Sequence, residues 1–158
     1  MQKNKTQNLV LCSLFVALIA AGAFIKIPVP VVPFTLQLLF TMIAWLLLGL
    51  KLGAVSLGAY ILIGLLGLPV FAEGGGPAYI LKPSFGYIIG FAAASYVTGV
   101  IANRVPNPTY RRLLAANFIG LGIVYLFGMV YYYLMSNLYL GHPIGLWPLF
   151  LFCFIVAV

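Results

Sequence analysis

Long apolar runs, broken by single basic residues, fill most of this 158-residue chain. Charged residues make up only 6% of it, with eight Lys or Arg against one acidic residue, Glu73. Soluble domains carry roughly 25% charged residues, because a folded core still needs a wetted surface. A disordered chain needs low hydrophobicity and high charge. The sequence therefore excludes a soluble globular protein and a disordered one, and indicates a protein whose solvent is lipid.

The net charge of +7 does not indicate a nucleic-acid partner. The basic residues stand apart between apolar runs, so they form no continuous stripe that could follow a phosphate backbone. Scattered Lys and Arg instead orient a membrane protein. We therefore predict no nucleic-acid binding and expect the lipid bilayer to surround the chain.

The apolar runs predict an all-α membrane protein, a bundle of six transmembrane helices. A helix needs about 20 apolar residues to cross a hydrocarbon core of roughly 30 Å. Five runs approach that length, and a sixth covers about half of it. The expected helices are approximately 9–25, 35–50, 52–68, 84–103, 113–135 and 147–158. The chain then forms a single integral membrane domain over 1–158.

Two of these runs depart from ordinary spans. The second and third are separated only by Lys51 and Gly53, which predicts a tight helical hairpin. The last run would rise about 18 Å, little more than half of a bilayer. Because polytopic proteins rarely end at mid-membrane, we expect the last helix to be truncated in this sequence.

Other interpretations of the runs are weaker. A transmembrane barrel would show alternating apolar and polar residues, whereas these runs are continuously apolar. The first run is also compatible with a signal peptide, because Lys3 and Lys5 precede it and Ala21-Gly22-Ala23 resembles a cleavage site.

The distribution of Lys and Arg predicts the orientation. With a cytoplasmic N-terminus, six basic residues fall in inner segments and two in outer ones. The inner residues are Lys3, Lys5, Lys51, Arg104, Arg111 and Arg112, and the outer residues are Lys26 and Lys82. We therefore expect the N-terminus to face the cytoplasm.

The outer connections are then 26–34, 69–83 and 136–146. The first cannot be helical, because Pro28, Pro30 and Pro33 each lack an N–H donor. An apolar, non-helical segment lies at membrane depth only where protein or a cavity surrounds it. We expect this segment to fold back over the outer ends of the helices, which makes the outer face the functional one.

The composition argues against catalysis and against a self-powered pump. A metal centre needs clustered ligands, and acid–base catalysis usually needs two tuned ionisable groups. The candidate groups are scattered, at Cys12, Glu73, His142 and Cys153. There is no Walker loop for ATP, and the apolar runs lack the carboxylates that ion-coupled carriers place inside the membrane. We expect no enzyme activity, no cofactor and no metal.

The loop at 68–87 has the composition of a small-molecule site. Gly74, Gly75 and Gly76 allow positive φ and a close approach of the backbone to a ligand. The polar groups are Glu73, Lys82 and Ser84, and the flat apolar faces are Phe71, Tyr79 and Tyr87. A small organic ligand with an apolar body and few polar atoms would suit this lining. A flexible connector with interfacial aromatics would have the same composition, so both interpretations stay open.

Three positions near the outer ends of the runs have polar groups. Gln37 lies just inside the second run, where its amide needs a partner, so it is a candidate for ligand contact. His142 stands beside Pro143 in the last outer loop, which favours a structural role. The three tyrosines 131–133 close the fifth run and are typical of an interfacial aromatic belt.

Small residues at four-residue spacing mark two of the predicted helices. They are Gly86, Gly90, Ala94 and Thr98 on one helix, and Ser13, Ala17 and Ala21 on the first. Such stripes let helices approach closely. Internal packing is the ordinary explanation, and docking of another membrane protein is the alternative for the first helix.

Three motifs together indicate a family. They are Ile27-Pro-Val-Pro-Val-Val-Pro-Phe-Thr-Leu-Gln37, Gly67-Leu-Pro-Val-Phe-Ala72 and Lys82-Pro-Ser-Phe-Gly-Tyr87. At these motifs the chain resembles BioY, the biotin-binding S component of energy-coupling factor (ECF) transporters. The resemblance runs from about Thr6 to the end, and the three motifs are specific only in combination.

The resemblance implies high-affinity biotin binding and uptake across the cytoplasmic membrane of a prokaryote. Such S components have six helices, both ends inside and a pocket capped by outer loops. A transmembrane T subunit and two ATPases drive them, and only those ATPases use ATP. The family docks the T subunit through an A-x-x-x-A stripe on its first helix. Ala17 and Ala21 match that stripe, and Ser13 lies one turn earlier.

The chemistry of biotin then assigns roles to the candidates. The aromatic residues expected to enclose its apolar body are Phe34, Phe71, Tyr79 and Tyr87. The groups expected to pair with its ureido group are Glu73, Gln37 and the backbone at Gly75 and Gly76. Lys82 is the first choice for its carboxylate, and Lys26 the second.

The end of the chain departs from the family pattern. BioY proteins continue with a Pro-Gly-Asp stretch and a nearby Lys that contribute to the pocket, whereas this sequence stops at Val158. Two alternatives stay open: an S component for another small vitamin, and a membrane scaffold subunit without transport activity.

Overall fold

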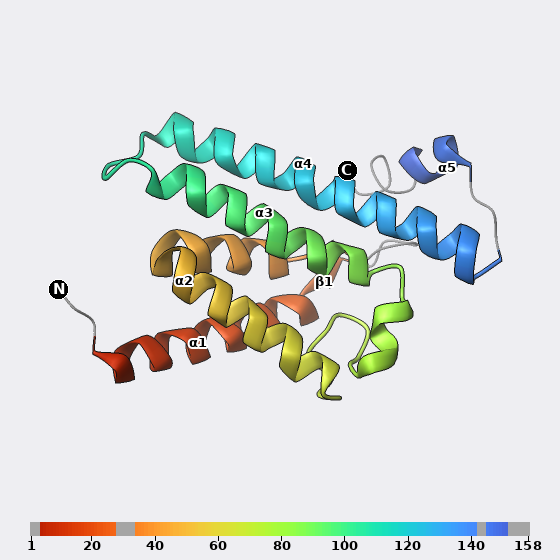
Figure 1. Cartoon of the computed structure of the whole chain (residues 1–158), viewed down its shortest axis with the longest axis horizontal. Helices are drawn as coiled ribbons and strands as arrows, with labels where there is room; N and C mark the ends of the chain where they lie inside the picture. Colours follow the sequence, from red (N-terminus) through yellow and green to blue (C-terminus); the bar gives the residue numbers. More distant parts are fainter. Residues whose placement is uncertain (1–3, 28–33, 142–144, 152–158) are drawn as a thin grey trace.

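Long helices dominate the computed structural model, which describes residues 4–27, 34–141 and 145–151 (Figure 1). The helices are α1 (Lys5–Phe24), α2 (Gln37–Leu65), α3 (Phe85–Asn103), α4 (Tyr110–Leu134) and the short α5 (Leu146–Phe150). The minor elements are β1 (Lys26–Ile27), β2 (Phe34–Thr35), the 3-10 turn η1 (Pro77–Leu81) and the π-helical η2 (Met135–Tyr139). Among the described residues, four helices are long and apolar enough to cross a membrane: α1, α2, α3 and α4 extended to Tyr139.

Helix α2 contains a sharp turn at Gly49, and its two halves double back on each other (Figure 1). A Cβ atom at Gly53 would lie 3.0 Å from the Cα of Trp45, whereas eight residues of straight helix rise about 12 Å. Gly49 has φ 80° and ψ 178°, a conformation that only glycine adopts readily. The turn therefore lies at Gly49, and the expected break at Lys51 was placed too late.

Replacing Gly49 by Ala is expected to destabilise the protein by about 1–3 kcal/mol, because a side chain is strained in this conformation. Gly58→Ala is the matched control, since Gly58 lies in the same helix and a Cβ there meets nothing within 4 Å. In a helix interior that change stabilises by up to about 1 kcal/mol. Unfolding midpoints in detergent measure the stability of the two variants. Equal midpoints for Gly49→Ala and Gly58→Ala would show that Gly49 does not need its positive φ.

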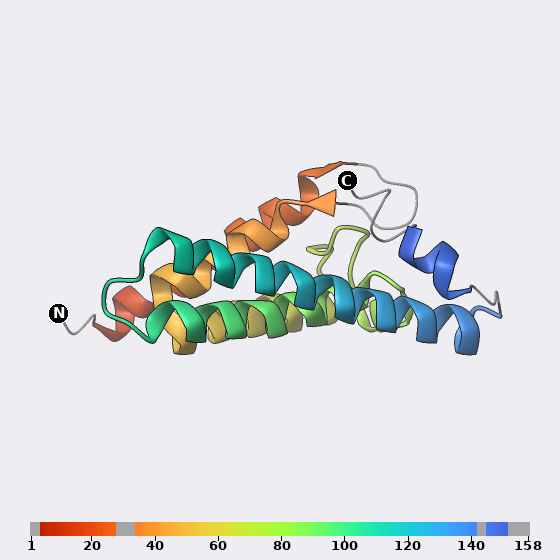
Figure 2. The same ribbon diagram turned by 90° about the horizontal axis from the view of Figure 1, so that it is seen from above.

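The α3 stripe of small residues packs against α4. A Cβ at Gly90 would lie 3.0 Å from the Cα of Val124, and the Thr98 hydroxyl donates to the Ala116 carbonyl at 3.2 Å. Figure 2 shows α3 and α4 side by side along the long axis. This stripe therefore serves internal packing, the ordinary explanation of such spacing.

The α1 stripe is used differently. Ser13, Ala17 and Ala21 are all exposed, while α1 turns Phe15 and Ile19 into the core. Within the described part of the chain, no helix covers these three small residues. The surface they leave is open to a partner.

The loops of the bundle lie at two opposite ends (Figure 1). The start of α1, the Gly49 turn and the 104–109 loop lie together at one end, and the loop between α2 and α3 lies at the other (Figures 1 and 2). The expected sixth helix, 147–158, overlaps α5, and residues 152–158 lie outside the described residues. His142 also lies outside them.

Candidate functional site

Residues 66–84, here called the cap loop, join α2 to α3 in a compact, hydrogen-bonded segment. The backbone groups of Phe71 and Gly74 bond each other in both directions, at 2.9 and 3.2 Å. The N–H of Gly76 donates to the Gly64 carbonyl at 2.7 Å, which ties the cap loop to α2. Gly74 and Gly76 have φ of 116° and 102°, so these turns depend on glycine.

Gly75 allows two segments of backbone within the cap loop to pack closely. A Cβ at this position would overlap the Leu68 carbonyl oxygen, which belongs to the backbone and cannot swing away. Glycine is therefore needed at Gly75 for close backbone packing, whatever further role it has toward a ligand.

A row of aromatic rings fills the space beneath the cap loop. Successive ring centroids lie 5.4, 4.6, 6.4 and 6.1 Å apart. The rings belong to Tyr60, Phe71, Tyr79, Phe85 and Tyr131. Their tilted and edge-on geometries are those that aromatic pairs prefer. The cap loop is thus anchored to α2, α3 and α4 at once.

Two of the expected ligand-enclosing residues belong to this row. Phe71 is 0% exposed and Tyr79 3%, and the Phe71 ring lies in a notch that a Cβ at Gly64 would fill. Both rings pack against protein. Tyr87 is also buried, but in a separate cluster on α3, where a Cβ at Gly128 would lie 2.5 Å from its ring.

Sequence reasoning missed the tyrosines that hold the cap loop. The Tyr60 hydroxyl donates to the Val70 carbonyl at 3.0 Å, and the Tyr131 hydroxyl donates to the Ile80 carbonyl. Tyr131 is therefore more than a member of an interfacial belt. The sequence did contain one signal for these contacts: a tyrosine hydroxyl within an apolar run needs a hydrogen-bond partner from elsewhere in the protein.

The polar groups of the cap loop gather at its exposed edge. The Lys82 ammonium donates to the Glu73 carbonyl at 2.9 Å and lies 3.8 Å from Oε2 of the Glu73 carboxylate. The Ser84 hydroxyl donates to the same Oε2 at 3.1 Å and lies 3.3 Å from the Tyr79 hydroxyl. Lys82 also stands over the Tyr79 ring, 5.1 Å from its centroid. The structure thus brings four candidate polar and aromatic groups together.

The Tyr79 hydroxyl stays neutral at this edge. Burial is the main cause that raises its pKa above the ordinary value. A neutral phenol keeps its proton at physiological pH, so it can donate to a nearby acceptor while its ring faces Lys82.

The first outer connection meets the cap loop. Its two ends pair as antiparallel strands, with Lys26 opposite Thr35 and Ile27 opposite Phe34. The Lys26 ammonium donates to the Ala72 carbonyl at 3.1 Å. Residues 28–33 and the Phe34 side chain lie outside what the structure describes, so Phe34 is placed by its backbone alone.

Gln37 begins α2 and is 2% exposed. Its Nε2 is buried and has no hydrogen-bond partner among the described residues. A buried polar group without a partner costs about 1–3 kcal/mol. A ligand carbonyl at this position would remove that cost, which keeps Gln37 among the candidates.

Among the described residues, no group of three or more His, Cys, Asp or Glu could hold a metal ion. The site is therefore a set of hydrogen-bonding and aromatic groups around a glycine-rich turn. Such a set can bind and orient a small organic molecule.

Comparisons with known proteins place this chain in a family. All 158 residues of the chain match the model of the BioY family. The chain belongs to the BioY family. It is 49% identical to a probable biotin transporter BioY from Lysinibacillus sphaericus, over 89% of this chain and 72% of that protein. It is 39% identical to the biotin transporter BioY of Thermotoga maritima, over 78% and 72%.

The chain is also similar to a solved structure. The chain matches the S-component for biotin from an ECF-type ABC transporter with a TM-score of 0.75 and 29% identity. The match covers 90% of this chain and 79% of the solved one. The helical fold described above is therefore similar to that of the solved ECF S-component.

Proposed function

We propose that this chain binds biotin and carries it across the cytoplasmic membrane of a prokaryote as the S component of an ECF-type ABC transporter. The observation that carries the proposal is the likeness to the S-component for biotin, at a TM-score of 0.75 over 90% of the chain. The names of the BioY relatives describe the same activity. This is a transport component and not an enzyme.

Transport by such a chain needs an external motor. The sequence has no Walker loop for ATP and no carboxylate within its apolar runs. One transmembrane T subunit and two ABC ATPases would supply the energy, in keeping with the ECF-type transporter of the structural relative. ATP is then used by the partners alone.

The proposed topology has six helices with the N-terminus in the cytoplasm. Support comes from the charges, because Lys5, Lys51, Arg104, Arg111 and Arg112 all belong to the end of the bundle that holds the start of α1 (Figure 1). An excess of basic residues marks the cytoplasmic side. The two halves of α2 count as separate helices, and the apolar run at 147–158 is counted as the sixth.

The proposed site lies at the opposite, outer end, around the cap loop. Lys82 binds the biotin carboxylate, and Glu73 and Gln37 pair with the ureido group together with the backbone at Gly75 and Gly76. The exposed ion pair of Lys82 with Glu73 is worth only about 0.2–1 kcal/mol, so a ligand can replace it at little cost. Phe34, Phe71, Tyr79 and Tyr87 are proposed to enclose the apolar body of biotin, with Tyr87 contributing from the separate cluster on α3.

An uptake assay tests the function in cells. The chain is produced with an ECF T subunit and its two ATPases in a biotin auxotroph that lacks its own transporter. Growth and uptake at nanomolar biotin are expected only when all components are present. Uptake of another vitamin in place of biotin would indicate an S component of different specificity, and no uptake by an assembled complex would favour a scaffold subunit.

The exposed stripe on α1 is proposed to dock the T subunit. Leu at both Ala17 and Ala21 would fill the flat surface that close helix approach needs. We expect the double variant to bind biotin normally but to lose co-purification with the T subunit and uptake. Ala115→Leu makes the same change at an exposed position of α4 and is expected to keep both. Normal assembly of the double variant would refute the docking role.

A further inference from the structure

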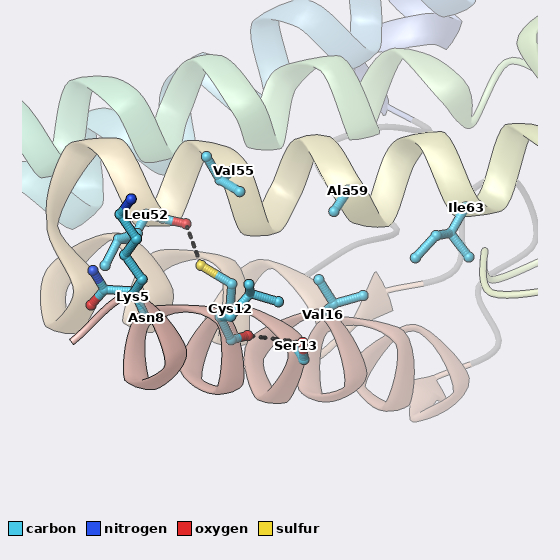
Figure 3. A pocket seen from close by; sticks show the side chains of 10 residues that line it. Lys5, Asn8, Cys12, Ser13, Val16, Leu52, Val55, Ala59 and Ile63 are labelled. Atoms are coloured by element: carbon cyan, nitrogen blue, oxygen red, sulfur yellow. Dashed lines mark hydrogen bonds between the residues drawn. The ribbon is translucent and has the colours of Figure 1, made fainter. Parts of the chain in front are cut away.

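A groove of about 560 Å³ runs between α1 and the second half of α2 (Figure 3). Its volume falls within the range of roughly 300–1,000 Å³ that is typical of sites for small organic molecules. It is separate from the cap loop site, because its polar residues are at the start of α1, at the other end of the bundle (Figures 1 and 3).

Two of the four polar side chains that line this groove, Cys12 and Ser13, bond to backbone carbonyls. The Cys12 thiol donates to the Leu52 carbonyl at 3.7 Å, and the Ser13 hydroxyl donates to the Leu9 carbonyl of its own helix at 2.9 Å. Beyond them, the walls are aliphatic as far as Ile63. The body of the groove therefore suits a hydrocarbon.

Two polar groups at one end of the groove are different. Lys5 and Asn8 lie three residues apart, on one face of α1, and Figure 3 shows them together at the end nearest Leu52. Lys5 is exposed and positively charged. The Oδ1 of Asn8 is buried without a hydrogen-bond partner among the described residues. This end offers a cation and an unused acceptor.

The groove has the length of one membrane leaflet. From Leu52 to Ile63 the α2 wall rises about 17 Å, and half of a hydrocarbon core of roughly 30 Å is about 15 Å. Lys5 and Asn8 then lie where lipid headgroups begin. A chain of methylene groups inserted along the walls would reach from that level to mid-membrane.

We propose that this groove binds one anionic phospholipid whose headgroup has hydroxyl groups, as in phosphatidylglycerol. An acyl chain lies along the aliphatic walls, the phosphate accepts a hydrogen bond from the Lys5 ammonium, and a headgroup hydroxyl donates to Oδ1 of Asn8. The proposal goes beyond biotin transport, because it needs only that α1 and α2 stand in a bilayer.

Native mass spectrometry of the purified chain tests the headgroup contact. The chain in detergent is mixed with equal amounts of phosphatidylglycerol and phosphatidylcholine that have the same acyl chains. One retained phosphatidylglycerol is expected in clear excess over phosphatidylcholine. Lys5→Gln is expected to lower its retention roughly fivefold, the effect of one basic residue near an anionic lipid. Lys51→Gln, an equal charge change at an exposed residue outside the groove, is expected to leave it unchanged.

A second pair of variants tests the acyl-chain contact. Ala59→Trp would fill the groove and is expected to abolish retention of the lipid, whereas Leu62→Trp places the same side chain on an exposed position outside it. Melting temperatures check that each variant is folded. Equal retention of the two lipids, an equal loss for both lysine variants, or a lipid retained by Ala59→Trp would overturn the proposal.

Discussion

Replacing Phe71 by Ala is expected to lower the free energy of unfolding by about 3–5 kcal/mol, the usual cost of deleting a fully buried aromatic ring. The ring is 0% exposed and touches Tyr60 and Tyr79, at centroid distances of 5.4 and 4.6 Å. It lies directly on the α2 backbone, because Gly64 leaves room for it. Its loss removes the ring that joins Tyr60 to Tyr79 in the aromatic row that anchors the cap loop.

The unfolding midpoint in detergent measures this effect, and Phe118→Ala is the control. Phe118 is 70% exposed on α4, so its replacement is expected to change stability little. Biotin affinity should fall with Phe71→Ala as well, because the loop that positions Glu73 and Lys82 loses its support. A Phe71 variant as stable as the Phe118 variant would show that the cap loop does not depend on this ring.

Replacing Lys82 by Met is expected to weaken biotin binding by about 10- to 150-fold, which corresponds to the roughly 1.5–3 kcal/mol of a hydrogen bond to a charged group. The reason is that we assign the biotin carboxylate to this ammonium. Equilibrium binding of labelled biotin to the purified variant measures the loss.

Biotin methyl ester separates the carboxylate contact from damage to the cap loop. The ester lacks the negative charge, so Lys82→Met should weaken its binding little. Glu73→Gln breaks the same 3.8 Å ion pair but should weaken both ligands alike, because we assign Glu73 to the ureido group. A Lys82 variant that loses biotin and the ester equally would refute the carboxylate role.

The helices were predictable because each apolar run is long and continuous. Their exact breaks were not, because the turn in α2 falls in a stretch where Leu and Gly alternate around Lys51. Only the backbone shows that Gly49 and not Gly53 takes the positive φ. The two small-residue stripes also look alike in sequence. They differ in whether another helix packs on them: α4 packs on Gly90, and no described helix covers Ala17.

The composition of the cap loop predicts a ligand site, and this stays a prediction; the internal contacts of the loop were not predictable. Glycines, aromatics and a Glu–Lys pair within one loop indicate ligand binding and structural packing equally well. The burial of Phe71 depends on the notch at Gly64, and that of Tyr87 on Gly128. Each contact joins two segments that are apart in the sequence. The spacing of residues along one helix does not show which residues of a neighbouring segment face it, so these contacts could not be predicted.

Biotin recognition is tested most directly by equilibrium binding of labelled biotin to the purified chain in detergent, without the T subunit or the ATPases. We expect saturable binding of one biotin per chain, displaced by unlabelled biotin and not by thiamine or riboflavin. A melting transition confirms that the sample is folded. A folded chain that binds no biotin, or that binds another vitamin in its place, would contradict the function proposed here.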